Sequence, residues 1–171
     1  MRFATYASVF VASTLVLIKL HAWLLSDSVA VLSSLIDSAL DAVASLLTLF
    51  AVHHALTPAD REHRFGHGKA ESIAALGQAA FITGSAIFLL FESSNRLMRP
   101  QSLDHGDLAI VVMVVSVVLT FALVRLQLYV VRRTGSIAIS ADSIHYKADL
   151  LVNVGIIVSL VLSTRLELPR A

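Results

Sequence analysis

The chain has 171 residues, of which 57% are hydrophobic and only 15% are charged, and its formal net charge is +1. Soluble domains carry roughly 25% charged residues, so this composition and a mean hydropathy of +0.80 indicate a membrane protein. There is no cysteine, which excludes disulfides and thiolate metal ligands. No basic stripe suggests a nucleic-acid partner. The lipid bilayer is the expected environment.

Five segments are long enough to cross a bilayer, which takes about 20 mostly apolar residues. They are Phe3–Leu25, Ser28–His54, Ser72–Phe91, Leu108–Val131 and Ser136–Ser163. The first is expected to be retained rather than cleaved as a signal peptide, because its apolar run is long and no small-residue cleavage site precedes polar sequence. We therefore predict an all-α fold, a polytopic transmembrane bundle of about five spanning helices, with residues 1–171 forming one domain.

Two polar connectors separate these segments, an inner loop at Thr57–Glu71 and an outer loop at Glu92–Asp107. With the amino terminus in the cytoplasm, the inner side holds Arg2, Arg61, Arg64, Lys69, Arg132 and Arg133, and the outer side holds Arg96, Arg99, Arg165 and Arg170. Cytoplasmic loops carry an excess of basic residues. We expect a plasma-membrane protein, inner-membrane if bacterial, with a cytoplasmic amino terminus.

Four ionisable side chains lie within apolar segments as two pairs with the same spacing, Asp37 with Asp41 and His145 with Asp149. Residues four apart share one face of a helix. Ionisable groups at membrane depth are costly and usually face a partner or a water-filled path. The alternative is that each makes a local hydrogen bond, but matched pairs favour a site. Together, three carboxylates and one imidazole could hold a divalent cation.

A weak internal repeat relates these two pairs. A shift of 108 positions aligns the stretch from Ser28 with the stretch from Ser136, and it places Asp37 on His145 and Asp41 on Asp149. The two copies lie on segments that cross the membrane in opposite directions. Inverted repeats with a substrate site between them are a common plan of secondary transporters.

The inner loop contains a second candidate metal site. Asp60, His63 and His67 are three and four residues apart, which suits convergence on one ion, and Gly66 and Gly68 permit a sharp turn between or beside them. A polar loop with histidines is often only solvated, so both readings stay open on spacing alone.

Other polar residues are assigned ordinary roles. Lys19 lies near the far end of the first segment, and His54 at the inner end of the second is typical of an interface. Asp142 is expected to cap a helix or lie at the surface rather than to bind metal. Lys147 points away from the face of His145, which favours solvation or a salt bridge.

Three motifs in order resemble the cation diffusion facilitator family. They are Asp37-x-x-x-Asp41, the stretch HRFGHGKAES that begins at His63, and His145-x-x-x-Asp149. The resemblance implies a transporter, not an enzyme, that exports divalent metal ions in exchange for protons and forms a homodimer when complete. It implies a transport site at Asp37, Asp41, His145 and Asp149. It also implies a zinc site at Asp60, His63 and His67.

The resemblance also sets what is missing and which metals are expected. Family members have a sixth helix and a cytoplasmic domain, whereas this chain ends at Ala171, so it is expected to be truncated after the fifth helix. Zinc ranks first as substrate, with iron(II) or cadmium next, because an aspartate at position 37 goes with broader selectivity in the family. No prosthetic group is expected. Two alternatives stay open: a metal-binding subunit or inactive fragment that does not transport, and a proton channel or purely structural bundle.

Overall fold

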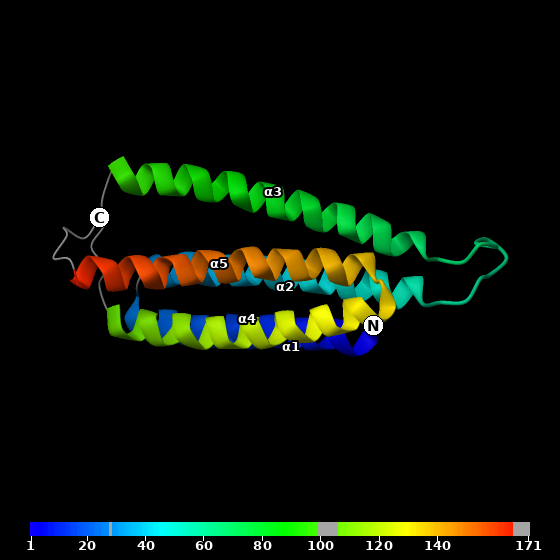
Figure 1. Ribbon diagram of the computed structural model, residues 1–171, viewed down its shortest axis with the longest axis horizontal. Coiled ribbons are helices and arrows are strands. Elements are labelled where there is room, and N and C mark those ends of the chain that lie inside the picture. Colours follow the sequence, from blue (N-terminus) through cyan, green and yellow to red (C-terminus); the bar gives the residue numbers. More distant parts are fainter. Residues whose placement is uncertain (28, 99–105, 166–171) are drawn as a thin grey trace.

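The computed structural model describes residues 1–27, 29–98 and 106–165, which form five long helices in alternating directions (Figure 1). They are α1 Arg2–Ser26, α2 Val29–Ala55, α3 Lys69–Met98, α4 Gly106–Thr134 and α5 Ile137–Arg165. No strand occurs within the described ranges. The predicted all-α polytopic bundle is confirmed.

The helices extend beyond the predicted apolar segments, most of all at α3. It begins at Lys69 and runs to Met98, so the ends of both predicted polar connectors are helical and those two loop boundaries were wrong. A helix satisfies its own backbone hydrogen bonds and can continue past the hydrocarbon core, which hydropathy cannot reveal. Ser28, part of the outer connector (99–105) and the chain end (166–171) lie outside the described residues.

Tight turns make α1 and α2, and likewise α4 and α5, antiparallel neighbours. Asp27 adopts a left-handed conformation at φ 49°, and its N–H donates to the Trp23 carbonyl at 2.8 Å. Gly135 has φ 66°, and its N–H donates to the Val131 carbonyl at 2.8 Å. A left-handed residue after the last turn is a common helix ending, and glycine adopts it without a Cβ penalty.

The helices are packed so that α2 and α5 lie between the others. α1 contacts α2 and α4, while α5 contacts α4, α3 and α2. α3 lies at the edge and diverges from α5 toward the end of the bundle opposite the loop of residues 56–68 (Figure 1). From position 83 to 91 nearly every described side chain of α3 is exposed. The remaining four helices form the compact part of the molecule.

Polarity is distributed as in a membrane protein, with large apolar side chains outside and small polar ones inside. Exposed positions include Phe10, Leu17 and Phe50, whereas Ser45 and Thr48 are fully buried. Small and hydroxyl-bearing residues allow close packing between helices in lipid. Helices α1 to α4 are each long and apolar enough to cross a membrane over the described residues. α5 is similarly long at 29 residues.

A continuous chain of buried polar side chains joins all five helices, one residue from each. We call Ser8, Thr48, Gln78, Gln127 and Asp142 the polar layer; each is at most 1% exposed. Gln127 Nε2 donates to Asp142 Oδ2 at 2.7 Å and to Ser8 Oγ at 2.9 Å. Gln78 Nε2 donates to Asp142 Oδ1 at 3.0 Å and to Thr48 Oγ1 at 2.9 Å. The predicted surface role of Asp142 was therefore wrong.

Sequence could not reveal this role of Asp142, because its partners lie on two other helices. Gln78 is 64 residues before it and Gln127 is 15 before it. A buried carboxylate is tolerated when several donors satisfy it. Here two amides do so.

Candidate metal centres

The first centre lies inside the bundle, where α2 and α5 meet. Asp41, His145 and Asp149 each offer a ligand atom, and these atoms lie within 4.8 Å of one another. His145 Nε2 is 2.9 Å from Asp41 Oδ1 and 3.8 Å from Asp149 Oδ2. His145 is 5% exposed, and Asp149 Oδ2 is buried without a hydrogen-bond partner. Two partly buried carboxylates and a buried imidazole therefore converge, and we call these three residues the membrane cluster.

Asp37, the fourth predicted ligand, is not part of this cluster. It lies four residues before Asp41 on α2, so both are on one face, but the Asp37 side chain is exposed. The structure thus brings three of the four predicted residues together. A ligand role for Asp37 stays a prediction.

Two sets of contacts hold α5 against its neighbouring helices. Ser45 Oγ and Tyr146 Oη are 2.7 Å apart, which joins α2 to α5 one residue after His145. At the start of α5, Glu71 accepts hydrogen bonds from Ser136 Oγ at 2.8 Å and from the Ile137 N–H at 3.0 Å. Glu71 therefore caps α5 from the first turn of α3, because the N–H groups of a first helical turn lack partners within the helix. The contact between Ser45 and Tyr146 joins the same two helices as Asp41 and His145, whereas the Glu71 bonds hold α5 against α3.

Lys19 of α1 is a functional candidate that the sequence reading placed only near a helix end. It is 8% exposed, and its Nζ donates to Ser38 Oγ at 2.6 Å and to the Ser34 carbonyl at 3.2 Å. Its charge lies within electrostatic range of Asp41, Asp37 and Asp149. The sequence did contain a signal for this role, because a charged residue inside an apolar membrane segment usually pairs with another polar or charged group.

The second centre is in the loop of residues 56–68. Asp60, His63 and His67 offer ligand atoms within 4.8 Å of one another. Asp60 Oδ1 is 3.3 Å from His63 Nδ1, and Asp60 Oδ2 is 3.5 Å from His67 Nε2. The structure therefore brings all three predicted residues together, and we call them the loop cluster. Whether they bind metal stays a prediction.

Backbone geometry organises the loop cluster. Asp60 Oδ1 accepts the His63 N–H at 2.5 Å and the Glu62 N–H at 3.0 Å. The hydrogen bond from His63 holds the pKa of the Asp60 carboxyl below its ordinary value. Gly66 has φ 78° and donates its N–H to the His63 carbonyl at 2.9 Å, which turns the chain back so that His67 faces Asp60.

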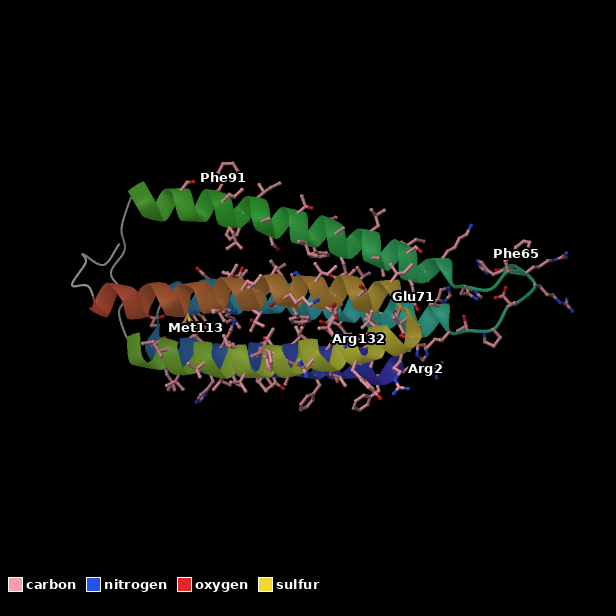
Figure 2. The ribbon with its side chains drawn as sticks, viewed as in Figure 1. Arg2, Phe65, Glu71, Phe91, Met113 and Arg132 are labelled. Atoms are coloured by element: carbon pink, nitrogen blue, oxygen red, sulfur yellow. The ribbon has the colours of Figure 1, made fainter. Side chains whose placement is uncertain are left out.

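His67 is the buried member of the loop cluster. It is 8% exposed, and its ring packs edge-on against His54 at the end of α2, with ring centroids 4.4 Å apart. His67 Nδ1 is buried without a hydrogen-bond partner. The loop projects from the end of the bundle that carries Arg2 and Arg132 (Figure 2). Its cluster is thus separate from the membrane cluster.

Comparison with known proteins identifies the family of the chain. A model of the cation efflux transmembrane domain matches residues 5–170. The chain belongs to the cation efflux family. It is 49% identical over 162 residues to the cation-efflux pump FieF of Shewanella oneidensis, an alignment that covers 95% of this chain and 55% of that protein.

Other relatives in the cation efflux family give the same picture. Identity is 48% over 160 residues to the cation-efflux pump FieF of Klebsiella pneumoniae subsp. pneumoniae, covering 94% of this chain and 53% of the relative. The FieF of Salmonella choleraesuis is 46% identical over the same length, with the same coverage. The chain thus spans about half the length of these relatives. It is an integral membrane protein of a transporter family and not an enzyme.

Proposed function

We propose that this member of the cation efflux family exports divalent metal ions from the cytoplasm in exchange for protons. The observation that carries the proposal is the convergence of Asp41, His145 and Asp149 inside a membrane bundle of this family. Acidic and imidazole side chains at such depth are expected to mark an ion path. The amino terminus would lie in the cytoplasm, on the side of the loop cluster.

Ligand chemistry favours zinc as the substrate. Asp41, His145 and Asp149, joined by Asp37 as fourth ligand, would offer three oxygens and one nitrogen, a set suited to tetrahedral zinc. Iron(II) and cadmium rank next, because mixed oxygen and nitrogen sites discriminate weakly among divalent ions. The chain has no cysteine to provide a softer ligand.

Proton exchange would follow from competition for the same atoms. A carboxylate binds metal only when ionised, and His145 binds only when Nε2 is neutral and unprotonated. In the structure that nitrogen is 2.9 Å from Asp41 Oδ1, so a proton can bridge the two groups when no metal is present. Metal arriving from one side would displace this proton, and protons from the other side would displace metal.

The polar layer supports alternating access. It lies between the membrane cluster and the loop end of the bundle, because Thr48 follows Asp41 on α2 and Asp142 precedes His145 on α5. Its side chains are fully buried and would close that route in the described conformation. Cytoplasmic entry would require these hydrogen bonds to open, and rocking of α5 against α2 would do this.

The loop cluster is proposed to bind a second zinc ion at the cytoplasmic end. Two imidazoles and one carboxylate are ordinary zinc ligands, and a fourth position can be taken by water or another side chain. The resemblance to the cation diffusion facilitators further supports a homodimer as the assembled form.

The test is zinc flux into vesicles that contain the purified chain and a zinc-sensitive dye, with and without a pH gradient. We expect gradient-dependent uptake that Asp149→Ala abolishes. Zinc binding by calorimetry without any flux would favour a metal-binding subunit or fragment that does not transport. Proton leak without zinc binding would favour a proton channel.

A further inference from the structure

Lys19 is a buried cation with neutral direct partners. Its Nζ donates to the Ser34 carbonyl and to Ser38 Oγ, both on α2, and neither partner carries a charge. In the described part of the chain, Lys19 is the only lysine or arginine among the buried residues. Burying an ammonium group is costly unless an opposite charge is close. The balance must come from carboxylates nearby.

Lys19 Nζ lies at the α2 turn between Ser34 and Ser38, which contains Asp37 and directly precedes Asp41. The charges of Asp41, Asp37 and Asp149 all act on the Lys19 ammonium. These are the acidic residues of the proposed transport site. Lysine side chains near helix ends often extend to the membrane surface. Lys19 instead points its charge inward, toward the α2 turn that separates Ser34 from Ser38.

The charges then sum in a simple way. Asp37, Asp41 and Asp149 carry −3 when all three are ionised, and Lys19 brings the total of these four groups to −2 while His145 is neutral. Asp142 is not counted, because the two amides of the polar layer hold its carboxylate. A divalent cation makes the filled site electrically neutral, whereas a trivalent ion leaves +1 and a monovalent ion leaves −1. In a low-dielectric interior an uncompensated charge is strongly unfavourable.

We propose that Lys19 is a specificity-determining residue that matches the charge of the membrane site to a divalent ion. Its ammonium offsets one carboxylate, limits how tightly the ion is held and so permits release. This inference rests on the proposed function, since it assigns Lys19 to the same site.

A purely structural role makes the opposite prediction. If Lys19 only tied α1 to α2, its removal would loosen the bundle and weaken metal binding. If it offsets charge, its removal leaves −3 at the site and tightens binding. The sign of the change in zinc affinity therefore separates the two roles.

The experiment uses a parent chain in which His63→Ala and His67→Ala remove the loop cluster. Zinc affinity is measured by calorimetry in detergent at pH 8 for this parent and for Lys19→Met, Lys19→Arg and Ser38→Ala. We expect Lys19→Met to bind zinc at least about tenfold more tightly, because the substitution removes a positive charge that repels the zinc ion. Lys19→Arg keeps the charge and Ser38→Ala removes only a neutral partner, so both should resemble the parent.

A second readout tests valence directly. Terbium(III) competes with zinc in the same variants and is followed by its luminescence. The affinity ratio of terbium(III) to zinc should rise in Lys19→Met and stay constant in Lys19→Arg. The reason is that a trivalent ion gains more than a divalent ion when the net negative charge of the site increases. Zinc binding that is unchanged or weaker in Lys19→Met, or a constant ratio, would overturn the proposal.

Failure of this inference differs from failure of the proposed function. A parent chain without zinc binding, indistinguishable from an Asp149→Ala control, would contradict both. A parent that binds zinc, with Lys19→Met equal or weaker, contradicts only the role of Lys19. If Lys19→Met does not fold by circular dichroism, Lys19→Gln carries the same test, because its amide can still donate to the Ser34 carbonyl.

Discussion

Gln127 Nε2 and Asp142 Oδ2 are joined by a 2.7 Å hydrogen bond between two side chains that are both 0% exposed. Because Gln78 bonds the other carboxylate oxygen at 3.0 Å, Asp142 is held from both sides by amide donors. The centre of the polar layer thus consists of one acceptor group between two donor groups. These hydrogen bonds require a carboxylate at position 142 and an amide at positions 78 and 127.

Gln127→Glu should therefore destabilise the bundle. The change keeps the size but sets a second carboxylate against Asp142, and an uncompensated buried charge costs about 3–5 kcal/mol. Asp142→Asn added to Gln127→Glu should recover most of this loss, since the introduced amide can donate to the new carboxylate and accept from Gln78. Thermal unfolding in detergent, followed by circular dichroism, measures the effect. A double variant no more stable than Gln127→Glu alone would contradict the assigned hydrogen bonds.

Asp41→Ala should weaken zinc binding at the membrane cluster more than Asp37→Ala does. Asp41 is a cluster member and lies 2.9 Å from His145, whereas Asp37 lies outside the cluster. We expect Asp41→Ala to lower the zinc affinity by more than the roughly 10–100-fold that is typical when a residue bonded to a metal ligand is removed. Calorimetry with the loop cluster removed provides the comparison. Equal losses would mean that Asp37 is as central as Asp41.

The loop cluster should lose zinc on acidification without losing its turn. The pKa of Asp60 is lower in the folded loop than its ordinary value of 3.8. The ionised carboxylate therefore stabilises the folded turn fully above pH 3.8, and this stabilisation is lost as the pH falls through the lower folded pKa. Between pH 7 and pH 5 the Asp60 turn should persist, while protons compete with zinc for the histidine rings. Amide NMR signals of Glu62 and His63, recorded beside a zinc titration, would separate the two effects.

Asp60→Asn serves as the matched variant for that experiment. Asparagine can still accept the His63 N–H, so the turn should remain, but the loss of charge should lower the zinc affinity of the loop cluster at least about tenfold. Unaltered zinc affinity in Asp60→Asn would exclude the carboxylate as a ligand.

Gly66→Ala should impair the loop cluster and leave the membrane cluster unchanged. At φ 78° an added Cβ has free space but costs about 1–2 kcal/mol in backbone strain. Gly68→Ala is the control, because Gly68 also has free space and no left-handed conformation. Zinc stoichiometry and affinity with Asp149→Ala in the background report the loop alone. If both alanine variants behaved alike, the turn at Gly66 would not position His67.

Sequence reasoning succeeded where a signal is local and repeated. Long apolar segments identified all five helices, and the spacing of His145 and Asp149 indicated one face of α5. The loop cluster could be predicted for the same reason, since Asp60, His63 and His67 lie within a short stretch that turns at a glycine.

What the sequence did not reveal depends on contacts between distant helices. Lys19 and Asp142 each looked like polar residues near helix ends, yet their partners lie on other helices. Position along the chain does not show which direction a side chain points once helices pack. The exposed position of Asp37 likewise depends on the rotation of α2, which the motif alone could not specify.

The polar layer also affects how the chain matures in the membrane. Asp142 comes from the last described helix, so the two glutamines that bond it lack this acceptor while the earlier helices are being synthesised and inserted. Each glutamine would then keep only its acceptors on α1 or α2, which include Ser8 for Gln127 and Thr48 for Gln78. Incompletely satisfied amides in hydrocarbon are unfavourable, which leaves a four-helix intermediate incompletely assembled. Arrival of α5 would complete every bond of the layer in one step. A ribosome-released chain ending before α5 should thus be a preferred substrate for membrane proteases that clear unassembled helices.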